Sequence, residues 1–357
     1  MTTTTDSENR ESTDGQAPTG RPHLRDRLLR SFDDLLALPP VVPLIDGLLY
    51  RDTLAQLAGP PGCFKSFLAI AMACSLATGR NLGSFVAPTP ATVVYVAAEG
   101  ASGLAARIAA WCDTWSVDPM TVFERLHILP LPIQLGSGVD VSQSIEVGGE
   151  VEADLLVLDT RARCTVGLEE NSATEQGVAI EAAESIRAAT NGCTVWPLHH
   201  TPRSGGAGRG SNSWDGAVWS DLRMERDGMR ATVHCAKHKD APDGCDHHFR
   251  FSIHTVAERL MPGLSEKERT TLVLSGVGSS AGISDLLPRS RQVVLDIIRN
   301  SAPEDGFTAT QVVKLAVATG MSESSAYAAL KELREQCLIK NIATQKRPRY
   351  VAVDPPP

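Results

Sequence analysis

The sequence lacks a long apolar run. The longest nearly unbroken one extends from Phe67 to Ala77, which is well short of the roughly 20 residues that a membrane-spanning helix needs. The first twenty residues are rich in Thr, Ser, Asp and Glu and have no apolar centre, so they do not have the pattern of a secretory signal peptide. The sequence therefore predicts a cytoplasmic protein that does not bind membranes.

Paired cysteine motifs are also absent. None of the eight cysteines forms a Cys-x-x-Cys pair, and without an export signal reduced thiols are the default. A cluster of possible zinc ligands is present nonetheless, and it comprises Cys235, His238, Cys245 and His247. Their spacing is not that of a standard zinc finger, so zinc binding is left open as the weaker interpretation.

Basic charge is scarce, because 34 Lys+Arg face 42 Asp+Glu and the formal net charge is -8. An acidic chain is a poor partner for phosphate backbones. The charge is uneven, however, since residues 289–352 hold ten Lys or Arg and six Asp or Glu, a balance of +4. Any contact with nucleic acid is therefore expected in the C-terminal part.

A length of 357 residues suits about two domains. Residues 1–22 are predicted to be a disordered acidic tail. Residues 23–274 alternate short apolar runs with helix-like stretches, which predicts an α/β fold with a mostly parallel sheet covered on both faces. Residues 275–288 are rich in Gly and Ser and are predicted to be a linker. Residues 289–357 are predicted to form a second, small α+β domain.

The expected elements of the larger domain can be given by range. The strands are Leu54–Ala58, Thr92–Ala97, Leu126–Leu129, Leu155–Leu158 and Thr194–Leu198, with helices at 65–79, 101–112 and 174–189. Later strands at Ala231–Ala236 and His248–His254 flank a Pro/Gly turn and predict an antiparallel hairpin.

The C-terminal segment has the pattern of a winged helix. A helix at Arg289–Arg299 precedes a second that starts at a capping box of Thr308 and Gln311, and Ser322 caps a third. Two short strands follow, Leu338–Ile342 and Tyr350–Val353. The candidate DNA contacts are Ser325, Tyr327, Lys331 and Arg334 on the third helix and Lys346, Arg347 and Arg349 in the wing. Winged helices also bind proteins, and that alternative stays open.

The strongest motif predicts a phosphate-binding P-loop, because it follows an apolar strand and opens a helix. The run is Gly59, Pro60, Pro61, Gly62, Cys63, Phe64, Lys65, Ser66 and Phe67. The glycines allow backbone amides to surround phosphates. Lys65 would reach the β- and γ-phosphates and Ser66 would ligate Mg²⁺. Phe64 stands where the last glycine of the motif belongs, and a Gly/Pro turn before an ordinary helix is the alternative.

Two carboxylates are candidates for the chemistry of hydrolysis. Asp159 ends an apolar strand, as the second Mg²⁺ ligand of a P-loop ATPase does. Thr160 follows it in place of a glutamate, so the general base must lie elsewhere. In RecA-type sheets the strand next to the P-loop strand carries the base at its tip, and Glu99 is predicted to fill that position. A solvated carboxylate at a helix N-cap is the alternative for Glu99.

Two histidines, His199 and His200, follow another apolar strand. Ligands bind at the carboxyl ends of strands in open α/β sheets, so one of them could contact the γ-phosphate. A lone histidine is more often structural. The next loop, 201–212, is basic and rich in glycine; it is predicted to face DNA, with a disordered surface loop as the alternative.

Residues ~41–260 resemble the RepA-like hexameric helicases, RecA-fold AAA ATPases of plasmids, phages and mobile elements. The segments that carry the resemblance are Gly59–Leu68, Val94–Gly100, Leu155–Ala162, Glu170–Ser172, His199–Thr201 and Gly208–Ser211. The departures are Phe64, Ala241 in place of a hairpin glycine, and a segment from Gln143 to Glu152 that lacks the expected amphipathic helix.

The resemblance implies a role for each matching residue. Within one subunit it implies Lys65 on phosphate, Ser66 and Asp159 on Mg²⁺, Glu99 as catalytic base and His200 as sensor. It also implies that Arg209 is an arginine finger that reaches a neighbouring subunit's nucleotide. Lys237 and Lys239, on a hairpin like that of DnaB-type helicases, would act in trans as well.

The predicted function is an ATP-dependent and Mg²⁺-dependent DNA motor. It would act as a hexameric ring around single-stranded DNA, with duplex or forked DNA at the winged helix and a primase as a possible partner. One alternative is a RecA-fold ATPase that loads or assists other proteins without unwinding DNA. The other is a nucleotide-gated DNA-binding regulator, which Phe64 favours.

Overall fold

The structure is a computed structural model, and it describes residues 28–83, 85–87, 89–190, 192–201, 213–277, 289–301, 306–335, 339–343 and 348–352. The contacts divide the chain into two units, residues 1–40 and 41–357. The described part of the first unit contains one short helix, α1 (Phe32–Leu36), which Ser31 and Asp34 cap reciprocally. No residue of α1 is buried. Arg209, Lys346 and Arg347 lie outside the described residues, as does most of the expected tail and all of the expected linker except residues 275–277.

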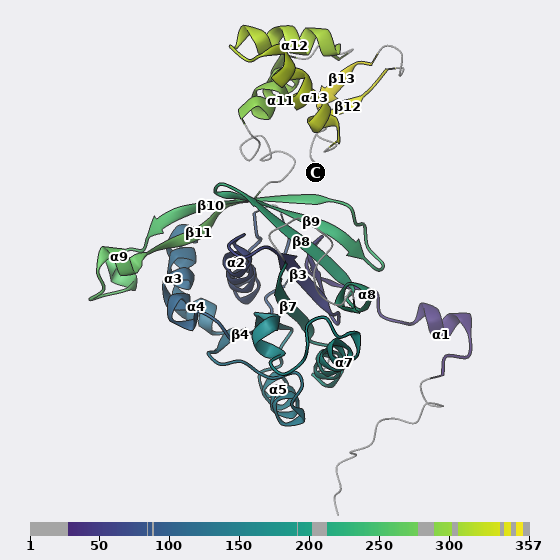
Figure 1. Cartoon of the computed structure of the whole chain (residues 1–357), viewed down its shortest axis with the longest axis vertical. Coiled ribbons are helices and arrows are strands. Elements are labelled where there is room, and N and C mark those ends of the chain that lie inside the picture. The colour runs from purple at the N-terminus through teal and green to yellow at the C-terminus, as the bar shows by residue number, and fades with distance from the viewer. Residues whose placement is uncertain are drawn as a thin grey trace, which may run out of the picture. The chain divides into compact units, whose positions relative to one another are not determined.

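The second unit is built on a nine-stranded sheet with the order β11-β10-β9-β8-β3-β7-β6-β4-β5 (Figure 1). The strands from β5 to β8 along this order are parallel, and β9, β10 and β11 continue the sheet as an antiparallel meander. This confirms the predicted α/β class with a mostly parallel sheet. The strands are β3 (Ala55–Gly59), β4 (Val93–Ala97), β5 (Leu126–Leu129), β6 (Leu155–Asp159), β7 (Thr194–His200), β8 (Ser220–Asp227), β9 (Arg230–His238), β10 (Asp246–Thr255) and β11 (Thr270–Val277). A separate two-stranded sheet pairs β1 (Pro43–Ile45) with β2 (Leu49–Tyr50).

The strand order corrects one expectation. The strand that leads to Glu99, β4, pairs with β5 and β6 and is not a neighbour of the P-loop strand β3. Both β7 and β6 lie between β3 and β4. The prediction that Glu99 follows the strand next to the P-loop strand is therefore wrong, although β4 is parallel to β6 and both end at the same edge of the sheet.

Helices cover both faces of the parallel strands (Figure 1). The buried cluster on one face includes residues of α2 (Lys65–Thr78), α3 (Leu104–Trp115) and α4 (Pro119–Phe123). The cluster on the other face includes residues of α6 (Arg161–Cys164), α7 (Ala173–Ala189) and α8 (Ser213–Ala217), with α5 (Gly138–Glu150) packed against it. A 3-10 turn, η2 (Ala101–Gly103), precedes α3, and η3 (Glu258–Leu260) and α9 (Glu266–Arg269) lie between β10 and β11.

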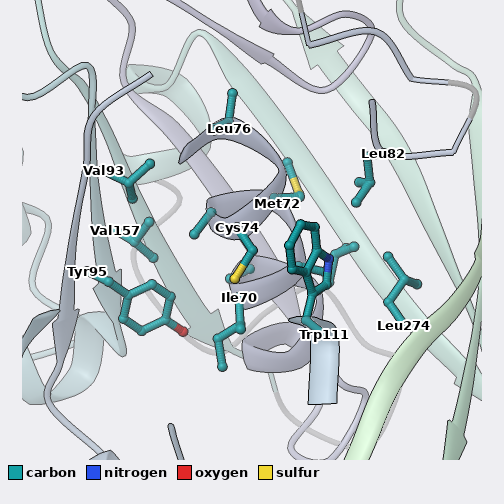
Figure 2. Packing of buried hydrophobic residues seen from close by; sticks show 14 of the residues in the cluster. Ile70, Met72, Cys74, Leu76, Leu82, Val93, Tyr95, Trp111, Val157 and Leu274 are labelled. Atoms are coloured by element: carbon teal, nitrogen blue, oxygen red, sulfur yellow. The ribbon is translucent and has the colours of Figure 1, made fainter. Parts of the chain in front are cut away.

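The α2 helix is apolar on nearly all sides because it lies inside the molecule. Figure 2 shows Ile70, Met72 and Cys74 of α2 among side chains from several strands and from α3. Alternate residues of β4 supply the two cores, since Tyr95 belongs to the α2 cluster and Val94 to the opposite one. This helix therefore fixes the P-loop rigidly to the core.

The α5 helix covers its face of the sheet only loosely. Ser137 caps it by accepting a hydrogen bond from the Asp140 backbone N–H, yet Gly148 is its only buried residue. A pocket of about 300 Å³ with a mainly apolar lining, which includes Val94, Leu156 and Ile186, lies beside it. This helix, which the sequence did not predict, is therefore present in the structure. Its apolar periodicity is weak because few of its side chains are buried against the sheet.

The C-terminal elements have a core of their own. They are α11 (Arg289–Ser301), α12 (Ala309–Ala318), α13 (Glu323–Glu335) and the antiparallel pair β12 (Ile339–Asn341) and β13 (Tyr350–Ala352). Buried residues of all three helices and both strands form one hydrophobic cluster. The predicted capping box of Thr308 and Gln311 is confirmed at the start of α12.

Across the parts of the chain that the structure describes, no helix combines the length and the apolarity needed to span a bilayer.

Candidate active site

The P-loop turns tightly between β3 and α2. Gly59 must be a glycine because a Cβ there would clash with the carbonyl oxygen of Met224 on β8. Gly62 has a φ of 80° and Phe64 a φ of 75°, so both are left-handed. A left-handed conformation costs a phenylalanine about 1–3 kcal/mol, and burial of its ring in the α2 core offsets that strain. Phe64 therefore keeps the turn that the usual glycine makes.

Lys65 is folded over this turn. Its ammonium group donates hydrogen bonds to the carbonyl oxygens of Gly59 at 2.7 Å and Pro60 at 3.0 Å. Its Nζ also lies 3.1 Å from Nδ1 of His200. Burial lowers the pKa of Lys65, and burial followed by the nearby Lys65 charge lowers the pKa of His200. His200 is therefore a neutral acceptor in contact with the P-loop lysine.

Ser66 and Asp159 form the second part of the site. The Ser66 hydroxyl donates to Oδ1 of Asp159 at 3.1 Å, and the Tyr95 hydroxyl donates to Oδ2 at 2.7 Å. Burial raises the pKa of Asp159, and the hydrogen bonds from Tyr95 and Ser66 oppose that rise. A hydroxyl and a carboxylate side by side are hard oxygen ligands of the kind that Mg²⁺ prefers. These residues therefore fit a magnesium ion.

Glu99 lies at the same edge of the sheet. The Thr160 hydroxyl donates to Oε1 of Glu99 at 3.1 Å, and the Glu99 backbone N–H donates to the carbonyl oxygen of Asp159 at 3.2 Å. The N-cap of the following turn is Gly100, and it has no side-chain cap. The alternative role of Glu99 as a helix cap is thus not the one found. Thr160, which follows Asp159 in the chain, holds the Glu99 carboxylate.

A pocket of about 240 Å³ opens over the P-loop. Its lining consists of Gly62, Phe64, Lys65, Ser66, Phe67, Arg107, His200 and Arg226. The sequence patterns did not predict two of these residues, Arg107 on α3 and Arg226 on β8. Nothing in the sequence could have found Arg226, because it follows the P-loop by more than 150 residues and lies in no motif.

A family model described as an AAA domain matches residues 21–206, just over half of the chain. The chain belongs to this AAA domain family. The match agrees with the P-loop geometry, because AAA domains are P-loop ATPases, a class that occurs in RepA-like helicases. An AAA domain implies nucleotide binding, usually with Mg²⁺, and ATP hydrolysis. No curated protein matches the chain.

The two histidines at the end of β7 lie on opposite faces of the AAA domain's sheet, because side chains alternate along a strand. His200 is on the P-loop face, whereas Nε2 of His199 is 3.6 Å from Oε1 of Glu170. Burial, followed by the charge of Arg161, lowers the pKa of His199 to about 3. Of the pair, only His200 contacts the P-loop.

Lys237 and Lys239 are bonded within their own chain. The Lys237 ammonium group donates to the carbonyl oxygens of Asp215 at 2.9 Å and Gly216 at 3.1 Å. Lys239 donates to the carbonyl oxygen of Ala217 at 3.3 Å. Both thus cap the carboxyl end of α8, where cations are favoured. Any action in trans requires them to leave these carbonyls.

The four possible zinc ligands do not converge. Among the residues that the structure describes, no three or more His, Cys, Asp or Glu are arranged to hold a metal. Cys235 is buried in the core, whereas Cys245 is exposed. His238 instead contacts the Ser220 hydroxyl at 3.0 Å.

The described DNA-contact candidates lie on α13 and just before β13. Ser325, Tyr327, Lys331 and Arg334 are all exposed on α13, and Ala326, Leu330 and Leu333 of the same helix are buried. Arg349 precedes β13 and donates to the carbonyl oxygen of Gly306 at 3.0 Å. The basic residues of α13 therefore face away from the C-terminal core.

Proposed function

We propose that this AAA protein is an ATP-driven DNA motor of the RepA-like helicase class. The observation that carries the proposal is one edge of the sheet where Lys65, the Ser66–Asp159 pair and Glu99 come together. These are the parts that an ATP-hydrolysing P-loop site needs: a phosphate-binding cation, magnesium ligands and a carboxylate base.

Each residue has a role in this proposal. Lys65 would exchange the carbonyls of Gly59 and Pro60 for the phosphates of ATP. Ser66 and Asp159 would hold Mg²⁺, which neutralises phosphate charge when it is bound. Glu99 would accept a proton from the attacking water. His200, neutral and bonded to Lys65, would sense the γ-phosphate.

The assembly is part of the proposal. We expect a ring of subunits, most simply a hexamer, with single-stranded DNA in the channel. Arg209 would complete a neighbour's nucleotide site, and Lys237 and Lys239 would do so after release from α8. A primase or another replication protein would be a partner of such a motor.

The C-terminal elements are proposed to bind duplex or forked DNA as a winged helix. Support comes from the spacing of Tyr327, Lys331 and Arg334, which places them along one exposed face of α13. The balance of +4 over residues 289–352 favours phosphate contact in this part of an otherwise acidic chain.

The site is tested by Lys65→Ala. Removing this cation should abolish ATP hydrolysis, measured as phosphate release with and without single-stranded DNA. Lys267→Ala, which removes an exposed lysine on α9, is the matched control and should retain wild-type turnover. Hydrolysis that persists in Lys65→Ala would show that the site is wrongly assigned.

The motor is tested separately by strand displacement on forked DNA and by light scattering. Wild-type protein should separate the strands with ATP and should reach a hexamer mass with a non-hydrolysable ATP analogue. Arg209→Ala should keep nucleotide binding and reduce turnover. Hydrolysis that leaves the fork intact would identify a loader, and a strict monomer would leave Arg209 without a target.

A second candidate is a nucleotide-gated DNA-binding regulator. Phe64 favours it, because a bulky buried side chain replaces the glycine of the P-loop motif and could slow turnover. Tight binding to one duplex sequence, with turnover unaffected by single-stranded DNA, would support this candidate over the motor.

A further inference from the structure

Phe64 and Arg226 form a contact that the P-loop motif does not explain. The guanidinium carbon of Arg226 lies 4.1 Å from the centroid of the Phe64 ring. Phe251 of β10 packs on the same ring, with the two centroids 4.8 Å apart. The bulky residue in the glycine position is thus a platform that joins the P-loop to β8 and β10.

Two hydrogen bonds fix the direction of the Arg226 side chain. Its Nη1 donates to the carbonyl oxygen of Gly62 at 3.0 Å, and its Nε donates to the carbonyl oxygen of Gly228 at 2.7 Å. An arginine has five N–H donors. In the described parts of the chain no acceptor takes the others, and Arg226 lines the pocket together with Lys65 and Ser66.

We propose that Arg226 is a further nucleotide-binding residue, which the same subunit supplies and which contacts a phosphate of the bound nucleotide. This inference rests on the proposed ATP site. Phe64 is a positioning residue, because its ring holds the guanidinium of Arg226 by a cation–π contact. Such a platform needs an aromatic ring, which neither glycine nor an aliphatic residue provides.

The chemistry of arginine suits this role. A guanidinium can stack on an aromatic ring and at the same time donate in-plane hydrogen bonds to phosphate oxygens. The Gly62 carbonyl holds Arg226 at the loop that surrounds the phosphates. The site would thus have a cation at the carbonyl of Gly62, in addition to Lys65 and Arg107, even when no neighbouring subunit is present.

The test measures equilibrium binding of MgATP and of inorganic tripolyphosphate to the full-length protein. Arg226→Gln should weaken both about tenfold, as expected for loss of one charged hydrogen-bonding group. Arg226→Lys should fall between wild type and Arg226→Gln, because charge remains but stacking is lost. Arg230→Gln, the same charge change at the start of β9 and outside the pocket lining, should bind like wild type.

The role of Phe64 is tested by a double-mutant cycle. Phe64→Leu should weaken MgATP binding two- to threefold in the wild-type background and have little further effect in the Arg226→Gln background. Phe64→Tyr keeps the aromatic ring, so this variant should bind MgATP as tightly as the wild type. Equal losses from Phe64→Leu in both backgrounds would show that Phe64 acts on its own and not through Arg226.

The outcomes separate this inference from the proposed function. Wild-type MgATP binding with no change in Arg226→Gln would overturn the role of Arg226 and leave the ATP site intact. Loss of ATP binding with unchanged tripolyphosphate binding would place Arg226 on the nucleoside, which also contradicts the inference. Failure of the wild-type protein to bind ATP would refute the proposed function and the inference together.

Discussion

At the scale of single residues, the candidate site depends on groups that hold its two carboxylates in place. Tyr95 and Thr160 each donate one hydrogen bond to a carboxylate of the site, to Asp159 and Glu99 respectively. Both donors are buried. A buried carboxylate left without its donors loses the stabilisation of its charged form. The Tyr95 hydroxyl therefore favours the charged form of the buried Asp159, and the Thr160 hydroxyl fixes the direction of the Glu99 carboxylate.

We expect Tyr95→Phe to change the response of the enzyme to metal and pH. The Tyr95 hydroxyl opposes the burial that raises the pKa of Asp159, so its removal should raise that pKa further. Turnover should then need more Mg²⁺, and the acid limb of the pH–rate profile should move to higher pH. Steady-state ATPase assays over a Mg²⁺ series at several pH values measure both effects.

Tyr50→Phe is the control for this substitution, since Tyr50 is another buried tyrosine and lies near Trp219, away from Asp159. It should leave the Mg²⁺ requirement and the pH profile unchanged. If Tyr95→Phe and Tyr50→Phe behave alike, Tyr95 has only a packing role.

At the scale of elements, β7 places the side chains of two adjacent residues on opposite faces of the sheet. His200 lies beside Lys65 on the P-loop face, and His199 lies beside Glu170 on the other. The pKa of His199 is lowered to about 3 by burial, so it is neutral in the folded protein throughout the physiological range.

This histidine should make stability depend on pH. In the unfolded chain its pKa returns to about 6.5, so below that pH the unfolded state binds a proton that the folded state does not. The stabilisation is complete above about pH 6.5 and is lost as the pH falls toward 3. Between pH 7.5 and pH 5 the loss from this one group is about 2 kcal/mol.

His199→Gln should therefore show a shallower fall of unfolding free energy between pH 7.5 and pH 5 than the wild type. Urea titrations at each pH, followed by circular dichroism, give the two slopes. Identical slopes would mean that His199 is protonated in the fold as readily as in the unfolded chain.

Elements with a strong local signal were predictable from the sequence, and the others were not. The β3, β4 and β6 strands are buried along their whole length, so they appear in the sequence as mainly apolar runs. β8 was missed because its second half is exposed and charged. The P-loop residues are contiguous and were found, whereas Tyr95, Arg107 and Arg226 come from three separate elements, and only the fold brings them to the site.

At the scale of the whole molecule, the net charge of -8 and the basic C-terminal segment have opposite effects on DNA binding. The acidic part repels phosphate backbones, so a single C-terminal segment should bind DNA weakly. Several copies in one ring would bind a strand many times more tightly, because each further contact is intramolecular.

DNA binding should accordingly depend on both assembly and salt. We expect affinity for a forked substrate to rise with an ATP analogue that promotes assembly and to fall steeply between 50 and 200 mM salt, about 10³-fold if roughly six phosphates are contacted. Fluorescence anisotropy over a salt series measures this. Affinity that is insensitive to salt would show that phosphate contacts do not drive binding.

The uneven burial of the cysteines has a practical consequence. Of the cysteines in the described residues, Cys245 is the exposed one, and burial raises the pKa of others such as Cys164 and Cys193 to about 12. Cys337 lies outside the described residues, so it is replaced by serine in this experiment. A maleimide dye applied to the Cys337→Ser variant should therefore label Cys245 first. The dye would then sit at the turn after Lys237 and Lys239, where a change in its emission would report the arrival of a neighbouring subunit.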